Sequence, residues 1–173
     1  MSLFSEAHLE QQKELHQSFP AYGQSSLVFA PMVSELINAN SVTSLIDYGC
    51  GLGLLGDNLE LNGELAVQNY DPALEQHATR PQPAEMLVCL DVLDVIEDDK
   101  IDAVLDDLKA LTDKMAFLSI NTETANQEGE GGDQRNFKPV EWWLPKIMER
   151  FELHYFSRID HGFVVVLKSV SKQ

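Results

Sequence analysis

An acid and three alternating glycines have the clearest chemical potential in this chain. Asp47, Gly49, Gly51 and Gly53 follow the short run 44–46, which has the small and apolar residues of a buried strand. Glycine has no Cβ, so a ligand can approach its backbone closely and the chain can turn tightly. Residues 54–61 look helical, and the free N–H groups at the start of such a helix would face the same crevice. This order predicts a nucleotide-type site at the carboxyl end of a central strand.

Further acids follow the next two predicted strands. Asp71 ends the strand expected over residues 65–70, and Asp91 and Asp94 follow the apolar run 86–90. Asp91 or Asp94 could deprotonate a substrate or hold its amine. The alternative is a solvated acidic edge, helped by the positive N-terminus of the next helix. Since Asp71 precedes a proline, it could also be an ordinary turn residue. The acids over residues 91–102 match no metal-binding loop, so we expect no metal.

The best candidate for substrate selection is the polar segment 121–138. It follows the strand expected over residues 115–120 and exceeds ordinary connections in length, which predicts a lid or a disordered segment. Arg135 and Asn136 are its strong donors and could hold a carboxylate or an amide. Trp142 and Trp143 follow on adjacent helix positions and cannot share one face. Two outcomes are therefore open: both are structural, or one packs into the core and the other, Trp142, borders the pocket and binds substrate.

The hydrophobic periodicity predicts alternating helices and strands, which are typical of an open α/β sandwich. Apolar residues at helical spacing or at capped ends predict helices over residues 3–17, 25–40, 98–111 and 140–150. Buried or alternating apolar runs predict strands over residues 44–48, 65–70, 86–90, 115–120, 151–157 and 162–167. The last two strands are expected to form an antiparallel pair that turns at residues 159–162.

Composition limits the class of protein. The chain has 173 residues and a formal net charge of −16, from 28 acidic and 12 basic side chains. Its length suits one domain over residues 1–173, in which helices of residues 1–40 cover the site of an α/β core over residues 41–173. The negative charge disfavours nucleic acid and anionic membranes as partners. No run approaches the roughly 20 apolar residues that cross a bilayer. With two cysteines and a polar N-terminus, a cytoplasmic location is expected.

The motifs resemble a known family in their order along the chain. The sequence Asp-Tyr-Gly-Cys-Gly-Leu-Gly of residues 47–53 resembles the first motif of the class I S-adenosylmethionine-dependent methyltransferases. Residues 89–96 resemble the motif of the family's fourth strand. More narrowly, Leu15 with His16, the Pro-Ala-Tyr-Gly sequence at 20–23, Arg135 with Asn136, and the Trp-Trp-Leu-Pro sequence at 142–145 look like a compact group of methyltransferases from bacteria and phages.

The resemblance implies a Rossmann-like, three-layer open sheet that is mostly parallel, with an antiparallel C-terminal strand. It implies S-adenosylmethionine as the cofactor and methyl transfer to a small molecule or, as a second choice, to a protein side chain. Asp71 would hold the ribose hydroxyls and Leu90 would offer its carbonyl to the ammonium group. The resemblance implies a cofactor-binding set of Asp47, Gly49, Gly51, Gly53, Asp71, Leu90 and Tyr22.

The chain also departs from the family. Only residues 72–85 separate the second and fourth strands of the family pattern, so the third strand is expected to be shortened or missing. The adenine contact of that strand would then be lost, and residues 80–84 could cover the adenine instead. Val95 replaces the histidine of the family's Leu-Glu-His-Ile pattern, so any chemistry assigned to that histidine is absent. These departures keep open an alternative function: a cofactor-binding or protein-interaction module that has lost catalysis.

The same glycines allow a rival interpretation. Residues 51–56 match the Gly-x-Gly-x-x-Gly fingerprint of dinucleotide-binding folds, and Asp71 follows at the required distance of about 20 residues. However, Asp47 and Gly49 interrupt the apolar approach to the first glycine. Little chain remains for the substrate-binding region that a dehydrogenase needs. The methyltransferase resemblance is therefore the preferred interpretation.

Overall fold

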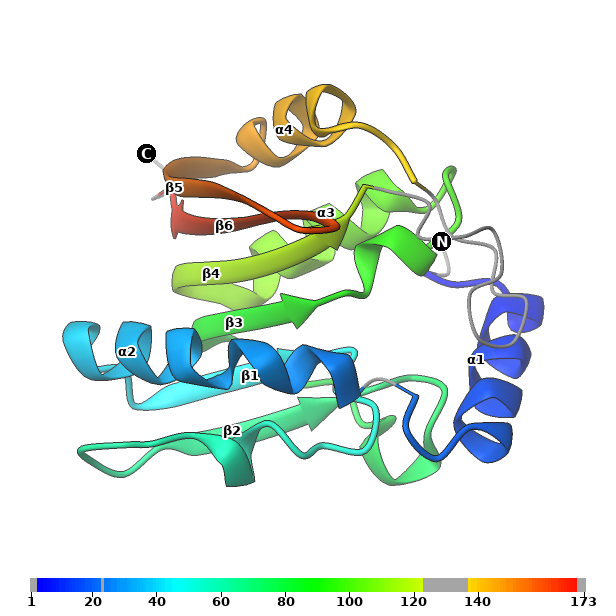
Figure 1. Cartoon of the computed structure of the whole chain (residues 1–173), viewed down its shortest axis with the longest axis horizontal. Coiled ribbons are helices and arrows are strands. Elements are labelled where there is room, and N and C mark those ends of the chain that lie inside the picture. The colour runs from blue at the N-terminus through cyan, green and yellow to red at the C-terminus, as the bar shows by residue number, and fades with distance from the viewer. Residues whose placement is uncertain (1–2, 23, 123–136, 171–173) are drawn as a thin grey trace.

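The computed structural model describes residues 3–22, 24–122 and 137–170, which build one six-stranded sheet (Figure 1). The strand order is β2-β1-β3-β4-β6-β5. The first four strands in this order are parallel, whereas β6 runs antiparallel to β4 and to β5. The strands are β1 Ser44–Tyr48, β2 Ala66–Tyr70, β3 Ala84–Leu90, β4 Thr112–Asn121, β5 Phe151–Ile159 and β6 Gly162–Ser169. The predicted strands and the C-terminal hairpin are thereby confirmed.

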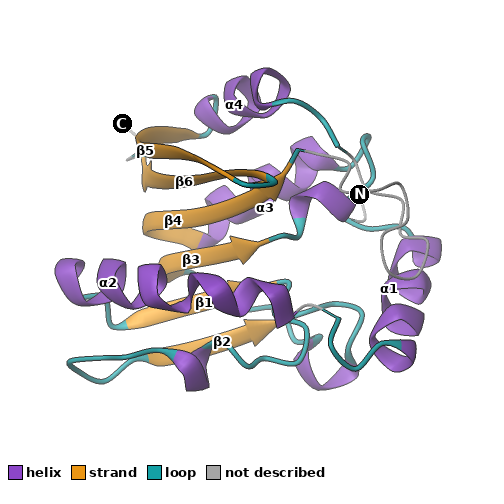
Figure 2. Cartoon of the chain, viewed as in Figure 1, coloured by secondary structure: helices purple, strands orange, loops and turns teal. Residues whose placement is uncertain are grey.

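Helices cover both faces of the sheet, giving three layers (Figure 2). On one face, α2 (Ala30–Asn40) packs Val33 and Ile37 against β1, β3 and β4, and a short 3₁₀ segment, Gln24–Phe29, leads into it. On the other face lie α3 (Ile101–Leu111) and α4 (Val140–Met148), whose apolar side chains share a core with β3, β4 and β6. The helical periodicity predicted all three helices correctly because each buries one apolar stripe.

Helix α1 (Glu6–Ser18) lies beyond the carboxyl ends of the parallel strands and runs across that edge (Figure 1). Ser5 caps it by accepting a hydrogen bond from the His8 N–H group. The Ser5 N–H group donates to Glu97 Oε2 at 3.2 Å, and Phe4 is buried in the core. The start of α1 is therefore fixed to the segment that follows β3.

The predicted loss of the third strand is confirmed. Between β2 and β3 the chain forms only one 3₁₀ turn, Glu75–His77, so β2 is an edge strand. The side-chain amide of Gln68 takes the place of a neighbouring strand: its Nε2 donates to the Gln82 carbonyl, and its Oε1 accepts from the Gln82 N–H group. Arg80 then pairs with the buried Asp107 on α3, which also accepts from the Tyr48 hydroxyl. The short connection thus covers the edge without a strand.

The prediction of a helix over residues 54–61 is wrong. This segment contains only a 3₁₀ turn, Gly56–Asn58. Glycine and asparagine at these positions are poor helix formers, and α2 supplies the hydrogen bonds that a helix would have provided. The Glu60 N–H group donates to Ser34 Oγ, and Asn38 bonds the Glu60 carbonyl and the Asn62 N–H group. Side chains of α2 therefore hold the segment in an open path.

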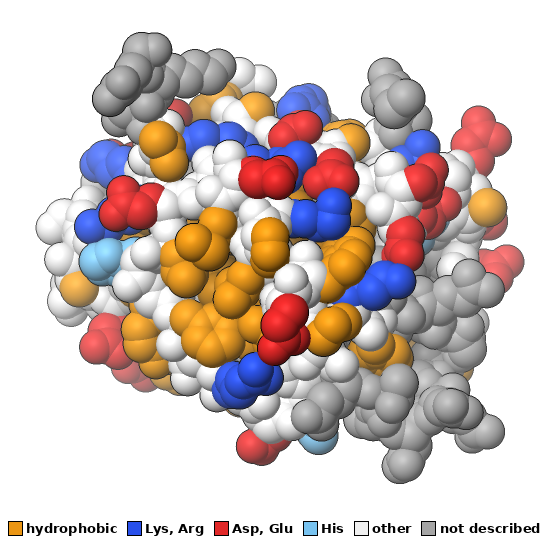
Figure 3. All heavy atoms as spheres, turned by 90° about the horizontal axis from the view of Figure 1, so that it is seen from above, with side chains coloured by type: hydrophobic (Ala, Val, Ile, Leu, Met, Phe, Trp, Pro, Cys, Tyr) orange, Lys and Arg blue, Asp and Glu red, His pale blue; other side chains and the backbone are white. Residues whose placement is uncertain are grey.

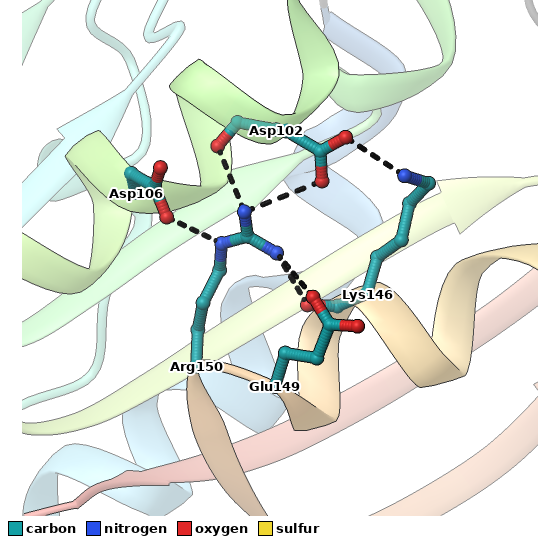
Figure 4. A network of polar contacts seen from close by, with 5 residues as sticks. All are labelled: Asp102, Asp106, Lys146, Glu149 and Arg150. Atoms are coloured by element: carbon teal, nitrogen blue, oxygen red, sulfur yellow. Dashed lines mark hydrogen bonds and ion pairs between the residues drawn. The ribbon is translucent and has the colours of Figure 1, made fainter.

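A charged network ties α4 to α3 on the outside of the molecule (Figure 4). The guanidinium of Arg150 bonds Asp106 through Nε at 2.6 Å and Asp102 through Nη2 at 3.2 Å. Lys146 also pairs with Asp102, at 2.8 Å, and this hydrogen bond lowers the pKa of the Asp102 carboxyl. These contacts fix the orientation of α4 on α3.

Strand β5 forms the other edge of the sheet. Its exposed residues include Tyr155 and Ile159, and Met148 of α4 is also exposed. Seen from this side, apolar side chains gather in the middle of the face and charged side chains lie around them (Figure 3). A register irregularity between Leu153 and Tyr155 and the charges of β5 make this edge a poor template for strand addition. Within the described part of the chain, no helix has the length and apolarity to span a membrane.

Candidate functional site

The glycine turn at the end of β1 is held by the end of β2. Gly49, Gly51 and Gly53 have φ values of 76°, 51° and 71°. The N–H groups of Gly49 and Cys50 both donate to the Tyr70 carbonyl, at 2.7 and 3.1 Å. At Gly49 a Cβ would lie 2.3 Å from Val92 Cγ2, so only glycine fits between β1 and the segment after β3. We expected amides of a following helix to face the crevice, but no such helix forms and these turn amides bond within the protein.

Asp71, directly after β2, braces the same turn. Its Oδ2 accepts from the Gly51 N–H group at 3.0 Å, and its Oδ1 accepts from the Ala73 N–H group at 3.0 Å. The second bond is that of an Asx turn before a tight bend, so the turn role considered from the sequence is present. Each carboxylate oxygen has a further lone pair. Asp71 can therefore brace the turn and still accept hydrogen bonds from a ligand.

Asp47 is a buried acid without a hydrogen bond among the described residues. It lies in β1, and only 5% of its surface is exposed. Burial, and secondly the charge of Asp71, raise its pKa to about 7. The amides of the adjacent turn do not donate to Asp47, because those of Gly49 and Cys50 donate to the Tyr70 carbonyl and that of Gly51 donates to Asp71. A buried carboxyl in this state is suited to receive a cation.

Asp91 and Asp94 lie at the carboxyl end of β3, beside the end of β4. Ser119 Oγ donates to Asp91 Oδ1 at 2.7 Å, and the Asp91 N–H group donates to the Ser119 carbonyl and hydroxyl oxygens. Asp91 adopts the left-handed φ of 56°. Asp94 is fully buried in a 3₁₀ turn, and Asn121 Nδ2 donates to its Oδ2 at 3.3 Å. The alternative of a solvated acidic edge is therefore wrong for Asp94, because its side chain is fully buried in the turn that follows β3.

Three of the acids lie around one thiol. Burial raises the pKa of the Cys89 thiol well above its usual value, and the carboxylates of Asp47, Asp94 and Asp91 raise it further. The structure thus brings together acids from the ends of two neighbouring strands, as their positions in the sequence predicted. Leu90 ends β3 in the same neighbourhood and is buried.

Helix α1 brings further polar side chains to this edge. His16 lies over the glycine turn: its Cε1 is 3.1 Å from where a Cβ of Gly51 would lie, and its Nε2 is 3.9 Å from Asp71 Oδ2. Burial lowers the pKa of His16, and Asp71 opposes this effect in part. Tyr22 packs edge-on against His16, with ring centroids 4.9 Å apart, and its hydroxyl donates to Gln12 Oε1 at 2.8 Å. Tyr22, a sequence candidate, is therefore next to the turn.

Sequence reasoning missed Gln12 and Ser119. Ser119 is the one polar residue in the apolar run 115–120, and that contrast was a usable signal. Gln12 had no such signal, because it lies among other polar residues of α1 and only the packing of the helix shows that it is buried. Polar side chains whose role depends on long-range packing cannot be identified from local patterns.

Two predicted features are not part of this cluster. Trp143 is fully buried in the core, and Trp142 packs edge-on against it, with Lys138 and Lys146 over its ring. No described contact joins Trp142 to the ends of β1, β2 or β3. Arg135 and Asn136 lie outside the described residues, as does most of the segment 121–138. Among the residues that can be described, no three His, Cys, Asp or Glu side chains form a metal-binding group.

Solved structures with a similar fold include methyltransferases of low sequence identity. An O-methyltransferase family protein from Burkholderia thailandensis matches 100% of this chain, with a TM-score of 0.74 and 12% identity, and this chain spans 65% of its length. The 1,6-didemethyltoxoflavin-N1-methyltransferase of the same organism, with bound 1,6-didemethyltoxoflavin and S-adenosylhomocysteine, has a TM-score of 0.67 and 13% identity over 95% of this chain and 89% of its own. Magnesium protoporphyrin IX methyltransferase from Synechocystis PCC 6803, with bound S-adenosylhomocysteine, has a TM-score of 0.60 and 15% identity over 82% and 81%. No protein-family model and no curated protein matches the sequence.

These likenesses define the class of fold: the chain has the class I S-adenosylmethionine-dependent methyltransferase fold. Within that class it is a compact form, which lacks the third strand and has no helix directly after the glycine turn. The absence of this helix is also a departure from the dinucleotide fingerprint, in which a helix begins at the glycines.

Proposed function

We propose that this protein transfers a methyl group from S-adenosylmethionine to a small molecule. The observation that carries the proposal is Asp47, a buried carboxyl without a described hydrogen-bond partner, at the strand end where this fold has its glycine turn. Two solved neighbours of the same fold hold S-adenosylhomocysteine, and one of them also holds 1,6-didemethyltoxoflavin. The proposal includes a single domain whose N-terminal helices cover the site, and a cytoplasmic location.

The residues present fit this cofactor. Its amino-acid part carries an ammonium group and its sulfur is a cation, so carboxylates at the ends of β1 and β3 attract it. Asp47 would face the ammonium group, Asp71 would accept from the ribose hydroxyls, and Gly51 would allow close approach. The cofactor, when bound, supplies a methyl carbon that is already activated for displacement. The chain then has to hold the methyl acceptor beside that carbon, and such positioning can supply much of the acceleration.

Asp91 is the candidate for handling the proton of the methyl acceptor. Ser119 holds one of its carboxylate oxygens, Oδ1, at 2.7 Å, which fixes the plane of the group. A carboxylate held in this way can orient an amine or hydroxyl and take its proton. Asp94, which bonds Asn121, would add negative charge that favours a cationic or amine-bearing acceptor. Both roles, and those of Arg135, Asn136 and Trp142 in substrate binding, are part of the proposal.

A second candidate function is a cofactor-binding or interaction module without catalysis. It is supported by the missing third strand and by the turn amides, which bond within the chain rather than toward a ligand. The two candidates differ in a simple assay. An enzyme releases S-adenosylhomocysteine when mixed small amines, phenols and carboxylates are added with the cofactor, whereas a module binds the cofactor without turnover.

The first test of the proposed function is whether the protein binds the cofactor. We expect S-adenosylmethionine and S-adenosylhomocysteine, but not NAD, to raise the melting temperature of the protein. Asp71→Ala should weaken their binding by roughly 1.5–3 kcal/mol, since hydrogen bonds to a charged group are lost. Asp57→Ala, which removes an exposed acid beyond the turn, is the matched control. No stabilisation by either compound, or stabilisation by NAD alone, would remove the methyltransferase proposal.

A further inference from the structure

The buried face of α1 is polar, which is unusual for a helix that packs on a protein. Its buried residues are His8, Gln12 and Leu15. A surface helix usually turns an apolar stripe inward. Buried polar groups need hydrogen-bond partners, so such a face indicates that α1 covers something other than apolar core.

Gln12 is the residue of this face whose bonding is incomplete. Its side chain is 9% exposed, and its Oε1 accepts from the Tyr22 hydroxyl at 2.8 Å. Its Nε2 is buried and has no hydrogen-bond partner among the described residues. A buried donor without a partner destabilises the folded protein. Because the tyrosine fixes the oxygen side of the amide, the nitrogen is a donor held ready for an acceptor.

The position of Gln12 is set by contacts on both sides of it along α1. Four residues further along the helix, His16 lies over Gly51 and near Asp71. Before the helix, the Ser5 N–H group is bonded to Glu97, in the segment after β3. Since four residues of α-helix span about 6 Å, Gln12 lies over the edge between the glycine turn and the end of β3. Figure 1 shows α1 crossing the carboxyl ends of the strands in this way.

We propose that Gln12 Nε2 donates a hydrogen bond to the carboxylate of the amino-acid part of the bound cofactor. This inference rests on the proposed function. The amino-acid part brings an ammonium group, for which Asp47 is available, and a carboxylate, which needs a donor. In the described part of the chain, no lysine or arginine pairs with Asp47 or Asp71, so no cationic side chain is held beside these acids to receive the ligand's carboxylate. The amides of Gly49, Cys50 and Gly51 already donate to acceptors within the protein. The Gln12 amide nitrogen is a buried donor at this edge without a partner among the described residues, and α1 thereby forms the roof of the site.

The test compares two ligands that differ only in the carboxylate: S-adenosylhomocysteine and its decarboxylated analogue, which keeps the ammonium group. Titration calorimetry would measure both with the natural protein and with Gln12→Met, which keeps the length of the side chain and removes its donor. We expect Gln12→Met to weaken the binding of S-adenosylhomocysteine about 10-fold or more. The binding of the decarboxylated analogue should weaken less than about 2-fold. Gln17→Met, the same change at an exposed position of α1, should alter neither.

The melting temperature without ligand separates a binding role from a structural one. Gln12→Met removes a buried donor that lacks a partner and also the oxygen that accepts from the Tyr22 hydroxyl. These two effects have opposite signs, so we expect the melting temperature to change by no more than about 3 °C. Equal weakening of both ligands, or no weakening of either, would overturn the role of Gln12 while leaving the proposed function intact. If the natural protein binds neither ligand, the proposed function fails and this inference fails with it.

Discussion

Replacing Asp47 by asparagine should make the cofactor-free protein more stable at alkaline pH. Asp47 is 5% exposed, and burial and the nearby charge of Asp71 raise its pKa from 3.8 to about 7. The folded protein therefore holds this proton up to about pH 7, whereas the unfolded chain releases it near pH 4. Stability falls as pH rises between these two values, because the folded state binds more protons than the unfolded state. Asparagine has nearly the same shape and cannot ionise.

The size of the effect follows from the two pKa values. Each unit of difference corresponds to 1.36 kcal/mol, so the rise from 3.8 to about 7 gives a cost of roughly 4 kcal/mol at pH 8. At pH 4.5 most of this cost is absent, and about 1 kcal/mol remains. Acids that do not interact with Asp47 contribute equally in both proteins and cancel in the difference.

Urea unfolding followed by tryptophan fluorescence is a suitable assay, since the buried Trp143 reports on the core. The free energy of unfolding would be measured for both proteins at pH 4.5, 6 and 8. We expect the advantage of Asp47→Asn to grow by about 3 kcal/mol across this range. A buried asparagine amide has a cost of its own, but that cost does not depend on pH and shifts all three values equally. A difference that stays constant within about 0.5 kcal/mol would refute the reasoning.

Three further predictions follow from particular contacts. Cofactor affinity should rise about 10-fold from pH 6 to pH 8, because the ammonium group of the cofactor requires the ionised form of Asp47. Calorimetry in buffers of different ionisation enthalpy should show that Asp47 releases a proton when the cofactor binds. Gly49→Ala should destabilise the fold by about 3 kcal/mol, since φ is 76° and the new Cβ meets Val92; Val92→Ala should recover part of this loss in thermal unfolding. Arg150→Met should lower the free energy of unfolding by about 1 kcal/mol, because it removes the ion pairs with Asp102 and Asp106. Urea unfolding should show a smaller difference between the two proteins in 1 M salt.

The sequence predicted most of the sheet because local patterns determine it. The apolar run 86–90 is buried on both faces as β3, and residues 44–48 form β1 directly before the glycines. The missing third strand was also predictable, since residues 72–85 are too few and too rich in proline for a strand and its helices. In each case the decisive information lay within one short stretch of consecutive residues.

Features that depend on distant partners were not predictable. The segment 54–61 has leucines at helical spacing, yet Ser34 and Asn38 of α2 bind its backbone and keep it open. The amides that follow Asp47 donate to the carbonyl of Tyr70, which belongs to another strand. Both features have one cause: backbone N–H groups bond whichever acceptor the tertiary fold brings to them, and a sequence pattern does not show which one that is.

Backbone hydrogen bonds also explain why the neighbouring acids Asp71 and Asp47 affect stability and ligand binding differently. Asp71 accepts from two backbone N–H groups, so its charge is supported by the protein itself. Asp47 has no such donor in the described structure, and its ionisation is costly until a cation arrives. A cationic ligand would therefore gain from Asp47 the free energy that the empty protein loses by burying it. Stability and affinity are coupled through this one carboxyl, so a variant that stabilises the empty fold at pH 8 by removing the charge should lose the ligand to the same extent.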